Sequence, residues 1–136
     1  MKTPKQVATE WVAAFNARDA AAAVALYHDD AINVQVALEK PARGREEIHS
    51  FLAAFFRGFP DNYTTPENLF QDGEWAILEW SGGGTFFGEF DGHEPTGKSF
   101  TLRGCGFFHI VDGKIRFQRG YFDRAKWYKQ VGLPID

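Results

Sequence analysis

The chain has 136 residues and a formal net charge of −3, so it has the size of one domain and lacks the basic surface of nucleic-acid-binding proteins. It contains no apolar run of the roughly 20 residues that a membrane-spanning helix needs, and its single cysteine excludes an intramolecular disulfide framework. Aromatic residues make up 16% of the chain, which predicts a large core, an aromatic-lined cavity or an apolar subunit interface. We expect one cytoplasmic domain over residues 1–136, because no signal-peptide core precedes the first helix pattern.

Helical spacing of apolar residues dominates the N-terminal half of the sequence. Thr3, Pro4 and Gln6 have the spacing of an N-cap, a first helical position and a capping-box partner, so they predict where the first helix begins. Asp19 predicts the start of a second helix. The elements expected here are a helix that runs to Phe15, a short helix over 20–27, a short strand over 32–36 and a helix over 46–57.

From Tyr63 onward the apolar period changes to two, which is typical of strands. Asp72-Gly73 and Asp112-Gly113 are hairpin signals, and Gly82-Gly83-Gly84 indicates a bulge or a sharp bend. The expected strands cover 63–71, 75–80, 85–90, 100–111 and 114–123, and a terminal helix covers 124–131. Helices followed by an antiparallel meander predict the α+β class. We expect three N-terminal helices on the concave face of a strongly bent, mostly antiparallel sheet, a cone with an open end suited to a small molecule.

Four parts of the sequence, in this order and spacing, resemble one family. They are residues 14–19 with 26–31, 44–48, 84–90 with 95–98, and 112–115 with 121–123. Together they make the chain similar to the SnoaL-like branch of the NTF2-like superfamily, which includes polyketide cyclases and relatives of ketosteroid isomerase. The resemblance covers nearly the whole chain and implies the NTF2-like cone. It specifies the reaction much less, because this fold also hosts dehydratases, epoxide hydrolases and non-catalytic modules.

The resemblance implies that Asp123 acts as a general acid and base, since the cyclases of the family have an aspartate at the matching place. A carboxylate can remove a proton next to a carbonyl, and burial among aromatic rings would raise its pKa and make it a better base. The alternative reading is structural: Asp123 directly precedes the terminal helix and is a good N-cap residue.

Strand alternation places Phe117, Arg119 and Tyr121 on the same face as Asp123. If Asp123 faces the pocket, these residues face it too, unless a bulge at Gly120 shifts the register. Tyr121 would then donate a hydrogen bond to a substrate carbonyl, with a core tyrosine as the alternative.

The preceding strand places Arg103, Cys105, Phe107 and His109 on one face. We expect this face to line the pocket. His109 would pair with Asp123 or a ligand, or serve as a core or interface histidine, and Arg103 would bind a carboxylate or form a salt bridge. Cys105 is interpreted as a small buried residue or a nucleophile.

Two aromatic residues elsewhere complete the expected binding site. Trp80 would stack on a flat substrate ring, and Tyr27 would help to close the pocket, although both residues also have plain packing explanations. Cys105 and Phe86 depart from the family pattern, which has histidine at both places.

Three functions remain open. The first is a cofactor-independent enzyme that isomerises, cyclises or dehydrates an apolar cyclic carbonyl compound. The second is a binding module for an apolar metabolite, which the absent histidines favour. The third is a partner-binding scaffold; the resemblance implies a homodimer formed through the outer face of the sheet, with Phe108, Ile110 and Phe122 as candidate contacts. We expect no cofactor and no metal, because the four histidines are scattered and no phosphate loop is present.

Overall fold

A computed structural model describes residues 1–135 of the chain. Its elements in chain order are α1 (Pro4–Asn16), α2 (Ala20–Val24), β1 (Tyr27–Gln35), β2 (Ala42–Arg43), α3 (Gly44–Gly58), β3 (Tyr63–Asp72), β4 (Trp75–Thr85), β5 (Ser99–Val111), β6 (Lys114–Phe122) and α4 (Arg124–Val131). Within these residues, no helix is long and apolar enough to cross a membrane.

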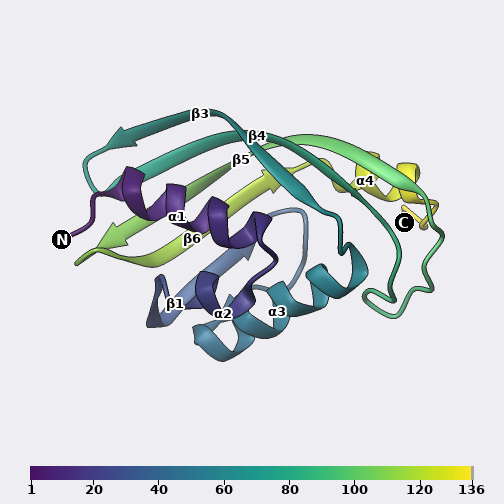
Figure 1. The fold of residues 1–136 in the computed structure, drawn as a ribbon, viewed down its shortest axis with the longest axis horizontal. Coiled ribbons are helices and arrows are strands. Elements are labelled where there is room, and N and C mark those ends of the chain that lie inside the picture. Colours follow the sequence, from purple (N-terminus) through teal and green to yellow (C-terminus); the bar gives the residue numbers. More distant parts are fainter. Residues whose placement is uncertain (136) are drawn as a thin grey trace.

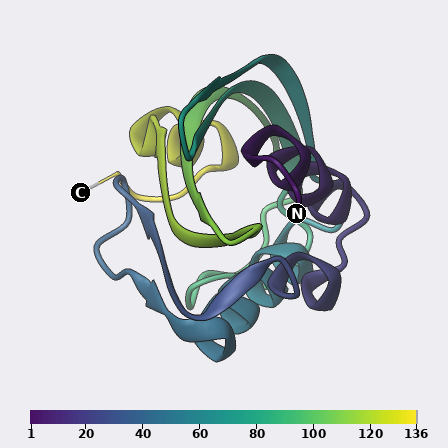
Figure 2. The same cartoon turned by 90° about the vertical axis from the view of Figure 1, so that its left-hand side faces the viewer.

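All six strands join one mixed sheet in the order β2-β1-β6-β5-β4-β3. The pairings are antiparallel except that β1 runs parallel to β6. Figure 1 shows the long strands β3 to β6 curving over α1 and α3, and Figure 2 shows the sheet wrapped around the interior with α1 across its open side. The expected α+β class, the bent sheet and the short C-terminal helix are therefore confirmed.

Capping places the starts of α1 and α2 where the sequence predicts them, whereas α3 begins at Gly44, two residues before the predicted start, without a side-chain cap. The Thr3 hydroxyl accepts the Gln6 backbone N–H at 3.2 Å, and the Gln6 side chain accepts the Thr3 N–H at 2.8 Å. Asp19 caps α2 by accepting the Ala22 N–H at 3.0 Å. These contacts satisfy amides that have no partner within the helix.

The second helix ends earlier than the sequence predicts. It stops at Val24, and Tyr27 already belongs to β1. The carbonyl of Leu26 accepts the Ile115 N–H at 2.8 Å, and Tyr27 pairs with Ile115 in the sheet. The prediction of a helix over 20–27 was wrong because this pairing across the sheet outweighs local helical spacing.

The three consecutive glycines do not interrupt β4. The pairing of β4 with β5 is continuous from Trp75 to Thr85, so the expected bulge and the separate strand over 85–90 are both wrong. A Cβ atom at Gly82 would lie 2.4 Å from the Tyr63 carbonyl oxygen, and one at Gly83 would lie 2.4 Å from that of Phe100. Glycine is needed here because neighbouring backbone approaches closely.

Two clusters of buried residues form the core. The larger cluster packs α1 and α3 against the sheet around Tyr27, Leu52 and Phe108. The smaller one surrounds Phe59 and Trp127, where α4 meets the end of α3. The space between these clusters holds the candidate site.

Candidate functional site

The bent sheet and its helices enclose a cavity of about 140 Å³. Most of its wall is aromatic or aliphatic: Trp11, Phe15, Phe51, Leu52, Phe55, Leu78, Trp80, Phe100, Leu102, Phe108, Phe122 and Trp127. Its polar lining residues are Asn33, Gln35, Asn62, Tyr63, Thr64 and Gln118. Among the described residues, the cavity lining contains no Asp, Glu, His, Lys, Arg or Cys.

Glycines on the inner face of the sheet leave this space open. The nearest heavy atom to a Cβ built on Gly106 would be 3.8 Å away, so this position has free volume above it. At Gly104, by contrast, a Cβ would lie 2.5 Å from the Trp80 ring. Trp80 thus fills the space over Gly104, while the cavity lies over Gly106.

A hydrogen-bonded chain of neutral side chains begins beside the polar wall. The Trp11 indole donates to the Tyr27 hydroxyl at 2.9 Å, and the Tyr27 hydroxyl donates to Oε1 of Gln118. Next to them, the Gln35 amide donates to Oδ1 of Asn33 at 2.8 Å. Asn33 and Gln118 are 3% and 4% exposed, so these amides lie within the protein rather than at its surface.

Tyr27 is held rigidly at the centre of this chain. Its carbonyl oxygen accepts from the Arg45 guanidinium at 2.9 and 2.6 Å, which ties β1 to α3. Burial raises the pKa of the Tyr27 hydroxyl above its ordinary value. The hydroxyl is therefore protonated at neutral pH and acts as a donor.

Sequence analysis did not single out Asn33, Gln35 or Gln118. The signal was present in β1, where apolar Ile32 and Val34 alternate with polar Asn33 and Gln35. Ordinary alternation would turn the polar pair toward solvent. In the structure both polar residues line the cavity, so the usual polarity of the two faces is inverted there.

The predicted pocket face of β5 and β6 is wrong. Leu102, Gly106 and Phe108 of β5 and Gln118 and Phe122 of β6 line the cavity. The residues that were expected there lie on the opposite, convex side of the sheet: Arg103, Cys105, Phe107, His109, Phe117, Arg119 and Tyr121. Phe108, Ile110 and Phe122, expected on the outer face, point inward instead.

The alternation itself is present, but both faces of the sheet are aromatic, so hydrophobicity could not identify the inner one. On the convex side, the Arg119 guanidinium lies 5.3 Å from the centre of the Phe107 ring and 5.6 Å from that of Phe117. This arrangement covers apolar rings with a cation. The prediction failed because it assigned the inner face from the two positions that the family resemblance marks, Asp123 and Cys105.

Asp123 lies outside the cavity. Its side chain is exposed, and its Oδ1 accepts the backbone N–H of Lys126 at 3.0 Å, which caps α4. The expectation that Asp123 faces an enclosed pocket is therefore corrected, since β6 ends at Phe122 and the carboxylate turns to the helix start. Its catalytic role stays a prediction.

His109 is far from Asp123. It binds the Glu74 carboxylate at 3.0 Å and stacks on the Trp75 ring at 4.7 Å. On β5 it lies five residues from Gly104, which pairs with Phe122, a separation of roughly 17 Å along the strand. A direct contact between His109 and Asp123 is therefore excluded in this structure.

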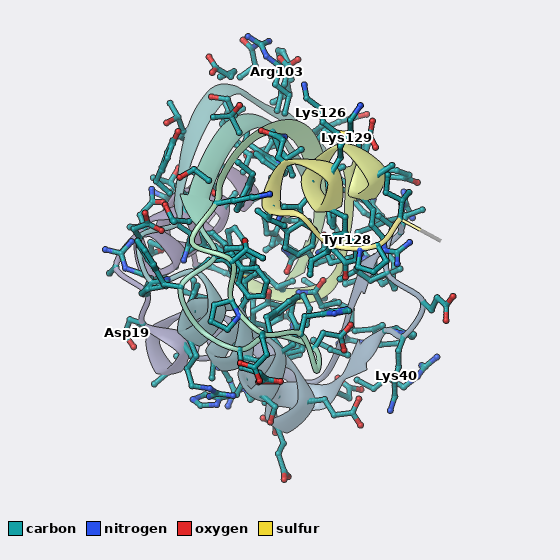
Figure 3. All side chains as sticks on the ribbon, turned by 90° about the vertical axis from the view of Figure 1, so that its right-hand side faces the viewer. Asp19, Lys40, Arg103, Lys126, Tyr128 and Lys129 are labelled. Atoms are coloured by element: carbon teal, nitrogen blue, oxygen red, sulfur yellow. The ribbon has the colours of Figure 1, made fainter. Side chains whose placement is uncertain are left out.

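Several of the predicted residues do come together, but in an open groove on the convex side. We call it the outer groove; it is lined by Glu79, Trp80, Arg103, Gly104, Cys105, Tyr121, Phe122 and Asp123. Figure 3 shows the Arg103 side chain directed away from the interior. Of the predicted binding residues, Trp80 lines the cavity and Tyr27 lies behind its polar wall.

Comparison with known proteins gives a consistent result. A family model described as SnoaL-like polyketide cyclase matches residues 5–131. The chain is 39% identical over 51 residues to the aklanonic acid methyl ester cyclase AcmA of Streptomyces galilaeus, a match that covers 38% of this chain and 35% of that protein. The matched segment thus spans about a third of the relative's length.

Solved structures share the fold. A protein of Catenulispora acidiphila with a ketosteroid isomerase-like fold, in complex with trimethylamine, superposes with a TM-score of 0.84 at 22% identity, over 98% of this chain and 96% of that one. IdmH of Streptomyces antibioticus, described as a putative polyketide cyclase, superposes with a TM-score of 0.80 at 24% identity, over 97% and 100% of the two chains.

Proposed function

Because the chain belongs to the SnoaL-like polyketide cyclase family, we propose that it binds an apolar, ring-bearing carbonyl compound in the cone. The observation that carries this proposal is the cavity lining, in which aromatic rings face neutral amides. Flat apolar ligands are favoured by such walls, and a few fixed polar groups orient them.

The size of the cavity fits part of a polycyclic ligand. An apolar cavity of about 150 Å³ holds one benzene-sized ring, and the volume here is about 140 Å³. Tyr63 lines the cavity and is 48% exposed, so the cavity reaches the molecular surface. A larger ligand would place one ring inside and extend past Tyr63. The curated relative is named for a methyl ester, which contains a carbonyl group and supports this ligand class.

The lining also favours binding and orientation over proton abstraction inside the cone. A general base for carbon acids needs a group that is unprotonated near neutral pH and lies close to the substrate. Asparagine and glutamine do not titrate, and the Tyr27 hydroxyl holds its proton. The geometry therefore supports a non-catalytic binding module best.

A ligand screen followed by product analysis tests this function. Apolar aromatic ketones and esters should raise the melting temperature of the protein, and bound ligand should be recovered unchanged after long incubation. Conversion of the ligand by the wild-type protein would contradict the non-catalytic assignment, and failure of every apolar carbonyl compound to bind would contradict the proposal as a whole.

Proton transfer by Asp123 is the second candidate. It is supported by the outer groove, where the Asp123 carboxylate lies among Arg103, Cys105 and Tyr121. Arg103 would attract an anionic substrate, and Tyr121 would donate to its carbonyl. The test is turnover by Asp123→Asn, which keeps a good N-cap but removes the base. Unchanged turnover would rule out this role.

The convex side of the sheet supports a homodimer. Phe107 and Phe117 are only partly buried there and Tyr121 is 41% exposed, although exposed rings are costly in water. A second copy packed on this face would cover them. Light scattering at micromolar concentration should give twice the mass of the chain, and Phe107→Glu should give the monomer mass. A monomeric wild-type protein would contradict this proposal.

A further inference from the structure

The polar wall of the cavity contains a buried amide donor, the NH₂ group of Gln118, that forms no hydrogen bond within residues 1–135. We infer that the side-chain amide NH₂ of Gln118 binds the acceptor oxygen of the ligand, such as a ketone or quinone oxygen, and that Tyr27 is the positioning residue that turns this amide toward the ligand. This inference rests on the proposed binding function, and it adds the recognised group and the residues that select it.

The chemistry of the chain fixes the direction of each hydrogen bond. The Trp11 indole nitrogen can only donate, so the Tyr27 oxygen must accept from it at 2.9 Å. The single hydroxyl proton of Tyr27 is then free for Gln118. Gln118 must accept this proton through Oε1, and its NH₂ group therefore points away from Tyr27. This orientation follows from the donors and acceptors that the three side chains carry.

Burial keeps this arrangement in place. Tyr27 is 0% exposed, and the Arg45 guanidinium grips its carbonyl oxygen at 2.6 Å. Because the Tyr27 hydroxyl is shielded from water, a rotation of the Gln118 amide that brought NH₂ in place of Oε1 would leave the hydroxyl proton buried without an acceptor. The Gln118 amide is thereby prevented from flipping.

The NH₂ group of Gln118 forms no hydrogen bond within residues 1–135, although the residue is 4% exposed and lines the cavity. The neighbouring Gln35 differs, because its Nε2 is occupied by Asn33 at 2.8 Å. An unpaired donor in the polar wall of an otherwise apolar cavity favours a ligand with an oxygen at that point and disfavours a pure hydrocarbon.

Other unpaired polar atoms of the cavity residues are less suited to this role. Trp127 Nε1 and Asn62 Oδ1 also have no partner among the described residues, but both atoms are shielded from the cavity surface by their surroundings. Gln118 Nε2 is not among these shielded atoms. The other buried amide of the wall, Asn33, forms a side-chain hydrogen bond with the Tyr27 hydroxyl. Of these two amides, Gln118 is therefore the one whose NH₂ group is turned away from Tyr27 and is accessible to a ligand.

A pair of probes of matched shape tests the inference. 1-Indanone and indane differ by one carbonyl oxygen, and their Kd values are measured from quenching of tryptophan fluorescence. We expect Gln118→Leu to weaken 1-indanone binding by about tenfold, as loss of one hydrogen bond does, and to change indane binding by less than about twofold. The ratio of the two fold-changes in Kd is not affected by the different hydration of the two probes, because each probe is compared with itself in the two proteins.

Two more variants separate recognition from positioning. Tyr27→Phe keeps the amide but lets it rotate, so we expect the preference for 1-indanone to fall by about threefold. Gln71→Leu is the control, since it removes an exposed glutamine of β3 that lies outside the cavity lining, and it should leave the preference unchanged. In Gln118→Leu the Tyr27 hydroxyl loses its acceptor. The double variant Tyr27→Phe/Gln118→Leu removes this hydroxyl as well, so that no buried donor is left unpaired.

A spectroscopic readout does not depend on any variant. The infrared carbonyl stretch of 1-indanone bound to the wild-type protein should lie below its frequency in a hydrocarbon solvent, because hydrogen bonding weakens the C=O bond. A hydrocarbon-like frequency would overturn the inference, as would equal effects of Gln118→Leu on the two probes. If neither these probes nor any other apolar carbonyl compound binds, the proposed binding function fails and the inference with it. If both probes bind without discrimination at Gln118, only the inference fails.

Discussion

Asp123 Oδ1 accepts a hydrogen bond from the backbone nitrogen of Lys126 at 3.0 Å. The carboxylate that the family resemblance marks for proton transfer thus caps the last helix on the convex side of the sheet. Trp127, the next residue of that helix, is 3% exposed and packs into the smaller core cluster. The cap therefore affects the packing of a residue that also lines the cavity.

Removing the cap at the start of α4 should lower the stability of the folded protein. We expect Asp123→Ala to reduce the free energy of unfolding by about 1 kcal/mol, while Asp123→Asn keeps most of it, because asparagine caps as well as aspartate. Urea unfolding followed by circular dichroism measures both values. Equal losses in the two variants would show that the charge, and not the cap, is what stabilises α4.

Two glycines on β5 should respond in opposite ways to the same substitution. Gly104→Ala places a Cβ 2.5 Å from the Trp80 ring and 2.5 Å from the Tyr121 carbonyl oxygen, so we expect a loss of about 1–3 kcal/mol from overpacking. Gly106→Ala meets its first neighbour at 3.8 Å and should be neutral or slightly stabilising. Thermal unfolding of both proteins tests this difference, and a similar loss in both would contradict the placement of the cavity over Gly106.

Burial of Tyr27 predicts a loss of stability at high pH. Burial raises the pKa of Tyr27 in the folded protein, while a tyrosine in the unfolded chain has a pKa of about 10. Above that pH the unfolded chain releases a proton that the folded chain retains, so the free energy of unfolding falls as pH rises. We expect the decrease between about pH 8 and about pH 11 to be smaller in Tyr27→Phe than in the wild-type protein.

Other groups also titrate in this range, so the comparison needs a control. Tyr121 is 41% exposed, and Tyr121→Phe should show the same decrease as the wild-type protein. If Tyr27→Phe and Tyr121→Phe lose stability equally, the Tyr27 hydroxyl is not buried in solution.

The family resemblance predicted the fold well because its motifs are largely structural. Arg45 of the second motif holds the Tyr27 carbonyl, and Asn16 of the first exchanges two hydrogen bonds with the Thr64 backbone at 2.9 and 2.7 Å. Thr96 of the third donates to the Val131 carbonyl at 2.7 Å, and Asp123 of the last caps α4. Residues that hold elements together recur with the fold and carry little information on the reaction.

The site could be predicted only in part. Alternation along β5 and β6 was correct, but Phe107 on one face and Phe108 on the other are both aromatic, so the sequence did not distinguish the inside from the outside. The polar wall was missed because Asn33 and Gln118 resemble ordinary solvent-facing strand residues. Their burial depends on how the bent sheet closes, which arises from contacts between distant parts of the chain.

Filling the cavity tests the central claim, that the cone is the ligand-binding site, most directly. Gly106→Leu would project a side chain into the open space above Gly106, and Cys105→Ser, its neighbour on the convex side, is the matched control. 1-Indanone is titrated into each protein, with quenching of Trp11, Trp80 and Trp127 as the signal. We predict that the wild-type protein and Cys105→Ser bind the ketone equally and that Gly106→Leu weakens binding by about tenfold or more. Equal binding by Gly106→Leu, or weakening by Cys105→Ser alone, would place the ligand outside the cone and contradict the account.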